Sequence, residues 1–132
     1  MDIQEHSGPE RVIDKIRNES AKKICLIGQT YSSIKKHMIE GPSGLLAEAD
    51  RRDIKYTYNR FSGEVRFHDF NAVCKCIPMW PVTTINHPYR FKNRRFDFIW
   101  CDRVKIDDKH DHEFKKYLML SVQNEKRILY ST

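Results

Sequence analysis

Short apolar runs that alternate with segments of helical periodicity constrain the fold of this chain most strongly. The segments with these runs span residues 24–27, 96–101 and 127–130 and are apolar apart from Asp97 and Arg127, and each is short enough to be a strand rather than a buried helix. Apolar residues at helical spacing predict helices over residues 9–18, between Thr30 and Gly41, and over residues 113–122. Strands covered by helices on both faces of a parallel sheet are apolar throughout. The pattern therefore predicts an α/β fold with a mostly parallel sheet.

The middle of the chain has a different period. Tyr56 and Tyr58, then Val65 and Phe67 beyond a Ser62-Gly63 turn, alternate with polar residues, which is typical of an antiparallel hairpin. Residues 73–77 predict a further strand. Ser43 is expected to cap a short helical turn over residues 44–49. Residues 78–95 are expected to form a long loop, and residues 105–112 a charged turn.

The length of 132 residues allows a single domain. Residues 1–8 are expected to be a polar N-terminal tail, and residues 9–132 the domain itself. Only 39% of the residues are hydrophobic, and the mean hydropathy is -0.70. These values predict a small or incompletely covered core.

Apolar segments and cysteines indicate the compartment. No apolar run approaches the roughly 18 residues that cross a bilayer, and the N-terminus is acidic and polar, unlike a signal peptide. We therefore expect an intracellular protein without a membrane partner. Cys25 and Cys101 lie in apolar runs and are expected to be buried and reduced. Cys74 and Cys76 lack the spacing of a structural zinc site.

The net charge of +6 would suit a polyanionic partner such as DNA. The densest basic stretch is interleaved with aromatic residues, a mixture that suits both stacking on nucleic acid and neutralising it. It consists of Arg90, Lys92, Arg94 and Arg95. The alternative interpretation is a basic loop that leads into a strand, and the sequence leaves both open.

Asp102 directly follows an apolar run, Phe98-Ile99-Trp100-Cys101. A carboxylate at the carboxyl end of a parallel strand faces the ligand crevice of an α/β sheet, where it can hold the waters of a Mg²⁺ ion that bridges two phosphates. Asp102 is therefore the candidate metal ligand. Asp97, Asp107 and Asp108 are further carboxylates that could join it.

Four segments, taken in chain order, resemble the ATPase domain of phage large terminase subunits. These subunits are the motors that package DNA, and close relatives occur in prophages and gene transfer agents. The most specific piece is Glu40-Gly41-Pro42-Ser43-Gly44-Leu45-Leu46 after a helix, and the resemblance covers about residues 9–132. It implies a partial P-loop-ATPase-like three-layer core plus a β-hairpin, a family that uses ATP and Mg²⁺, and a cytoplasmic protein of bacterial or phage origin. The four segments are Lys23–Thr30, Met38–Ala47, Phe98–Asp102 and Arg127–Thr132.

The chain departs from this family at the positions that carry catalysis. Residues 1–8 contain no Gly-rich loop with a lysine, so no cradle for the β- and γ-phosphates is expected. Arg103 stands where the family has its catalytic Glu, and arginine cannot act as a base. Phe91-Lys92-Asn93 replaces a family Leu-Arg-Gly, and residues 131–132 match only the start of the coupling motif. We therefore expect no catalytic residue, no nucleotide-binding residue and no cofactor.

Two hypotheses about function follow. The first is a terminase-like ATPase-domain fragment that is catalytically inactive. The alternative is a repurposed binding module, either for nucleic acid through the basic stretch or for a protein partner. Exposed sheet edges would also favour self-association.

Overall fold

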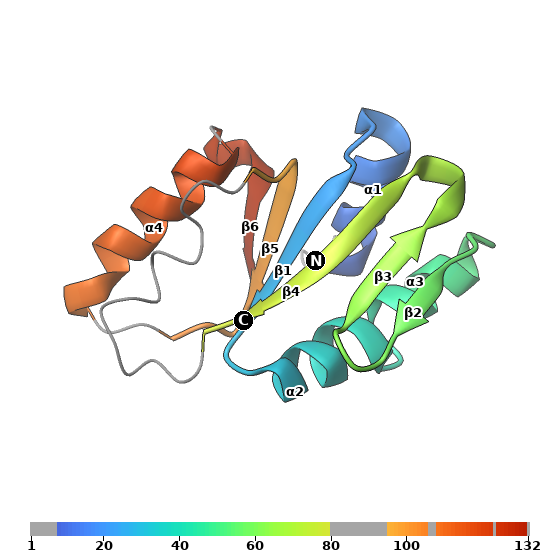
Figure 1. The fold of residues 1–132 in the computed structure, drawn as a ribbon, viewed down its shortest axis with the longest axis horizontal. Coiled ribbons are helices and arrows are strands. Elements are labelled where there is room, and N and C mark those ends of the chain that lie inside the picture. The colour runs from blue at the N-terminus through green and yellow to red at the C-terminus, as the bar shows by residue number, and fades with distance from the viewer. Residues whose placement is uncertain (1–7, 80–94, 106–107, 123, 132) are drawn as a thin grey trace, which may run out of the picture.

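A computed structural model describes residues 8–79, 95–105, 108–122 and 124–131, which form a six-stranded sheet with helices on both faces (Figure 1). The strands are β1 (Lys23–Gly28), β2 (Thr57–Asn59), β3 (Glu64–Phe67), β4 (Ala72–Pro78), β5 (Phe98–Asp102) and β6 (Ile128–Ser131). The helices are α1 (Gly8–Glu19), α2 (Tyr31–Ser33), the π-helix η2 (Ile34–Glu40), α3 (Leu45–Arg51), α4 (Asp108–Val122), and the 3-10 turns η3 (His68–Phe70) and η5 (Glu125–Arg127). Most of the long loop expected at residues 78–95 lies outside the described residues.

The sheet has the order β2-β3-β4-β1-β5-β6 and is mixed. β1 is parallel to both β4 and β5, and β5 is parallel to β6. The three apolar runs therefore lie in one sheet as parallel strands, as their pattern predicts. β3 is antiparallel to β4 and to β2, with Tyr58 opposite Val65. This antiparallel pair confirms the predicted hairpin.

Two hydrophobic cores lie on the two faces of the sheet. Side chains alternate between the faces along a strand, so Leu26 of β1 packs with α1, η2 and α3, whereas Ile27 packs with α4. Figure 1 shows α4 on the side of the sheet opposite α1, α2 and α3. The first core includes Ile13 and Phe98, and the second includes Phe114 and Leu118. The result is a three-layer α/β arrangement.

The helix after β1 begins as the sequence predicts but continues differently. The Thr30 hydroxyl caps it by accepting a hydrogen bond from the backbone N–H of Ser33 at 2.9 Å. From Ile34 onward the turns are π-helical up to Glu40. Ile34, Met38 and Ile39 nevertheless all face the core. Apolar spacing thus predicted the buried face, although it did not predict the wider helix.

Two expected local features are wrong. Ser43 is exposed and caps nothing, because Gly44 is the residue that precedes α3, and no side chain caps this helix. A Cβ at Gly44 would lie 2.5 Å from the Ile39 carbonyl oxygen, so the close backbone approach requires glycine there. The charged segment before residue 113 is not a turn throughout, since α4 already begins at Asp108. Acidic residues suit the first turn of a helix.

None of the helices in the described parts of the chain combines the length and the apolar character that crossing a bilayer would require.

Candidate functional site

The carboxyl ends of β1, β4, β5 and β6 meet at one edge of the sheet, because these four strands are mutually parallel. Asp102 at the end of β5 is opposite Ser131 at the end of β6. In open α/β sheets this edge is where ligands bind. Figure 1 shows that the chain leaves the end of β1 at this edge and enters α2. We call the residues Gln29, Trp100, Asp102, Arg103 and Ser131 the carboxyl-edge cluster.

Asp102 is held by a chain of hydrogen bonds across two strands. The Ser131 hydroxyl donates to Oδ1 of Asp102 at 2.7 Å, and the indole Nε1 of Trp100 donates to the Ser131 oxygen at 2.8 Å. Asp102 is only 8% exposed. Trp100 and Asp102 are two residues apart on β5, so both point to the face of the sheet that α1 covers. A buried carboxylate needs such partners, because an unpaired one would be costly.

Trp100 also contacts the start of α1. A Cβ added at Gly8 would overlap the Trp100 ring, so the first residue of α1 packs directly on the indole. The start of α1 therefore lies next to the residue that anchors Ser131 and, through it, Asp102. A glycine at this position allows the close contact.

Arg103 leaves the sheet in the left-handed region, with a φ of 55°. Its backbone N–H donates to the Ser131 carbonyl at 2.9 Å. Its guanidinium Nε lies 3.6 Å from Oδ2 of Asp102, and about half of the side chain is exposed. An ion pair at that distance and exposure contributes little to stability. The guanidinium of Arg103 has no hydrogen-bond acceptor, however, so Arg103 cannot take a proton from water.

Gln29 connects the end of β1 to the segment after β5. Its Oε1 accepts a hydrogen bond from the backbone N–H of Lys105 at 3.0 Å. The sequence predicted no role at this edge for Gln29 or Trp100, and for Ser131 only a match to the start of the coupling motif. The sequence does indicate a place for Ser131 at this edge, because Ser131, like Asp102, is a polar residue directly after an apolar run.

The other carboxylates considered as metal ligands do not join Asp102. Asp97 lies at the opposite end of β5, where its Oδ2 accepts hydrogen bonds from the backbone N–H groups of Lys22 and Lys23 at 2.7 and 3.0 Å. Asp107 and the side chain of Asp108 lie outside the described residues. Within the described ranges, no three His, Cys, Asp or Glu side chains gather as metal ligands. One carboxylate would hold Mg²⁺ only where phosphate oxygens and water supplied the remaining ligands.

The basic stretch is mostly outside the structural description. Arg90, Lys92 and Arg94 fall within residues 80–94, and Arg95 is exposed just before β5. Their predicted role in nucleic-acid binding therefore stays a prediction.

The four cysteines are buried, and none forms a disulfide. Burial raises the pKa of the Cys76 thiol to about 12, and it raises the pKa values of Cys74 and Cys101 further above their usual range. A thiol kept protonated is a poor nucleophile and a poor metal ligand. These cysteines therefore serve as small packing residues.

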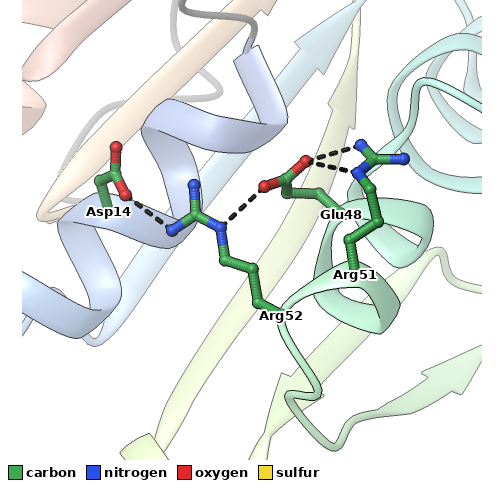
Figure 2. A network of polar contacts seen from close by, with 4 residues as sticks. All are labelled: Asp14, Glu48, Arg51 and Arg52. Atoms are coloured by element: carbon green, nitrogen blue, oxygen red, sulfur yellow. Dashed lines mark hydrogen bonds and ion pairs between the residues drawn. The ribbon is translucent and has the colours of Figure 1, made fainter.

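A charged network joins α1 to α3 (Figure 2). Glu48 accepts hydrogen bonds from Arg51 Nη2 at 2.6 Å and from Arg52 Nε at 2.7 Å, and Arg52 Nη1 reaches Asp14 at 2.7 Å. Burial by itself would raise the pKa of Glu48, but the hydrogen bonds and charges of Arg51 and Arg52 outweigh burial and lower it. The hydrogen bond to Asp14 is the main cause of the raised pKa of Arg52. Every carboxylate in this network is paired, so we assign it a structural role.

Comparisons of the chain with protein-family models, with curated proteins and with solved structures found no match.

Proposed function

We propose that this chain is a terminase-like ATPase-domain fragment that does not hydrolyse ATP by itself. The observation that supports it is the parallel arrangement of β1, β5 and β6 in one sheet, with Asp102 at its carboxyl edge. The resemblance requires this arrangement, since its segments at residues 23–30, 98–102 and 127–132 contain these strands. A structure with the three strands in separate sheets would have contradicted it.

Two features account for the proposed lack of ATP hydrolysis: the residues that precede α1, and the residue that follows Asp102. In a P-loop ATPase the phosphate loop directly precedes a helix at this edge of the sheet. Here α1 begins at Gly8 beside Trp100, and the seven residues before it contain neither glycine nor lysine. The position after Asp102 is Arg103, which cannot activate water. A missing general base alone lowers a rate by a factor of about 10² to 10⁴.

ATP turnover tests this proposal directly. We expect no Mg²⁺-dependent phosphate release by the purified chain or by Asp102→Ala. We also expect none from Arg103→Glu, because a restored carboxylate would still lack a phosphate cradle. Turnover that disappears in Asp102→Ala would contradict the inactivity. Turnover that survives Asp102→Ala would contradict both the inactivity and the terminase-like assignment.

The second candidate function is that of a binding module, and the net charge of +6 favours it. Binding of nucleic acid through Arg90, Lys92, Arg94 and Arg95 would weaken steeply with salt, whereas an apolar contact with a protein partner would not. An affinity for DNA that stays flat as salt rises would exclude the nucleic-acid form of this candidate.

A further inference from the structure

A groove of about 650 Å³ lies between the helical segment α2–η2 and the turn that joins β2 to β3. Tyr31, Lys35 and Lys36 line it from the helical side, and Arg60 lines it from the turn. The groove is open to solvent, and none of these residues belongs to the carboxyl-edge cluster. The residues that line it also differ from those of the basic stretch.

The charge of this groove is positive. Three cations, Lys35, Lys36 and Arg60, line it together with one carboxylate, Glu40. The Glu40 carboxylate already accepts a hydrogen bond from the Tyr58 hydroxyl at 2.5 Å. Lys36 and Arg60 are exposed. Cations spaced along an open groove suit the repeated charges of a phosphate backbone.

The turn on the far side of the groove is rigidly built. The Asn59 side-chain oxygen accepts hydrogen bonds from the backbone N–H groups of Phe61 and Ser62 at 2.9 and 3.3 Å. Gly63 closes the turn with a φ of +77° and donates to the Asn59 carbonyl at 2.8 Å. Lys35 Nζ donates to the Arg60 carbonyl at 3.2 Å, which ties the turn to η2. This turn therefore holds its shape through its backbone.

Phe61 projects from that turn with 96% of its surface exposed. The hydrogen bonds of the turn do not use its side chain, and the ring is not part of either core. Tyr31, on the helical side of the groove, is 45% exposed. Tyr31 lines the groove itself, and Phe61 directly follows Arg60, which lines it from the turn. Exposed aromatic rings at or next to a groove lined by cations suit the stacking of bases along a bound phosphate backbone.

We propose that this groove binds single-stranded nucleic acid. Phosphates lie along Lys35, Lys36 and Arg60, and unpaired bases stack on Phe61 and Tyr31. Stacking of this kind needs exposed base faces, which a duplex hides. The proposal stands independently of whether the domain descends from a terminase-like ATPase.

Fluorescence anisotropy of the full chain with labelled oligo(U) and oligo(dT), each about 15 nucleotides long, tests the proposal. We expect the log of the affinity to fall with the log of the salt concentration with a slope of about −2, the value for three phosphate contacts to a single strand. Phe61→Ala should weaken binding about tenfold through lost stacking. Lys36→Glu and Arg60→Ala should weaken binding and flatten the slope. Glu40→Gln should strengthen binding.

Matched controls separate the groove from the general surface charge. Lys116→Glu removes an exposed cation from α4, and Leu120→Ala removes an exposed apolar side chain from the same helix. Neither should change the affinity by as much as twofold, since α4 contributes no residue to the groove, which is lined by α2, η2, Gly41 and the turn between β2 and β3. Urea unfolding of each variant checks that the fold is intact, which we expect because Phe61, Lys36 and Arg60 are exposed.

Each outcome of these binding measurements either supports or overturns the proposal. Binding that is weaker in the groove variants but unchanged in the control variants supports the proposal. A preference for oligo(U) or oligo(dT) then identifies RNA or DNA as the strand bound. Equal affinity for a duplex of the same length would overturn it, as would an unchanged affinity in Phe61→Ala. Loss of binding only when Arg90, Lys92, Arg94 and Arg95 are all changed to Ala would place the site in the basic stretch instead. Absence of binding would also overturn the proposal.

Discussion

Asp102 shows how far the sequence specifies a candidate site at the scale of single residues. Its position after an apolar run predicts that it lies at the carboxyl edge of a strand, and it does. The sequence could not predict that Ser131 and Trp100 would hold it. Those contacts depend on the register of β5 against β6, which pairs Asp102 with Ser131 across about 30 residues of intervening chain. That an arginine follows Asp102 is read directly from the sequence, whereas its consequence for catalysis stays a prediction.

Ser131→Ala should destabilise the protein by about 1–2 kcal/mol, because it leaves the Trp100 N–H and an oxygen of Asp102 without their partner. Urea unfolding at neutral pH measures the change. Ser32→Ala removes an exposed hydroxyl and is the matched control, with an expected change under about 0.5 kcal/mol. Equal stability of Ser131→Ala and the native chain would mean that this hydrogen-bond chain does not support the sheet edge.

At the scale of elements, the sequence located every strand of the described residues, but the strand boundaries differ from the predicted ones by one or two residues. The last apolar runs were expected to begin at Phe96 and Arg127, whereas β5 begins at Phe98 and β6 at Ile128. Phe96 is taken out of the strand by a hydrogen bond from its N–H to the Ser121 carbonyl of α4. Arg127 ends the 3-10 turn η5. A contact with α4 at Phe96 and a local 3-10 turn at Arg127, neither of which periodicity encodes, thus set where β5 and β6 begin.

The charged network between α1 and α3 yields a pH-dependent prediction at this same scale. The pKa of Glu48 is lowered in the folded state, so its ionised form stabilises the fold above the unfolded pKa of about 4.5. That contribution is lost as the pH falls below 4.5 and through the lower folded pKa. We expect Glu48→Gln to cost about 1–2 kcal/mol at pH 7, since its hydrogen bonds to Arg51 and Arg52 are charged but partly solvated.

Urea unfolding of the native chain and of Glu48→Gln across this pH range measures the effect. The difference in stability should shrink as the pH falls below about 4.5. Glu64→Gln is the control, because Glu64 forms a more exposed ion pair with Arg66 on β3. A difference for Glu48→Gln that does not change with pH would contradict the assigned role of its charge.

At the scale of the whole molecule, the two cores share one sheet. The sequence pattern predicted parallel strands at residues 24–27, 96–101 and 127–130 and a hairpin between the first two of them, but it could not give the strand order. β1 lies between β4 and β5, although both are far from it in the sequence. Because the residues of β1 alternate between faces, Leu26 belongs to the core under α1 while Cys25 and Ile27 belong to the core under α4. Loss of either core therefore removes support from the same strand.

The cysteines can report whether the two cores unfold together. Cys74 and Cys76 lie in the core under α1, and Cys25 and Cys101 lie in the core under α4. Because all four are buried, each should react with iodoacetamide only after its own core has opened. We expect pulsed labelling in intermediate urea concentrations to give chains with either no label or all four, since a domain of this size unfolds in one cooperative step. Mass spectrometry counts the labels, and full denaturation is the control that yields four. A populated species carrying labels only on Cys25 and Cys101 would show that the α4 layer opens independently of the rest of the sheet.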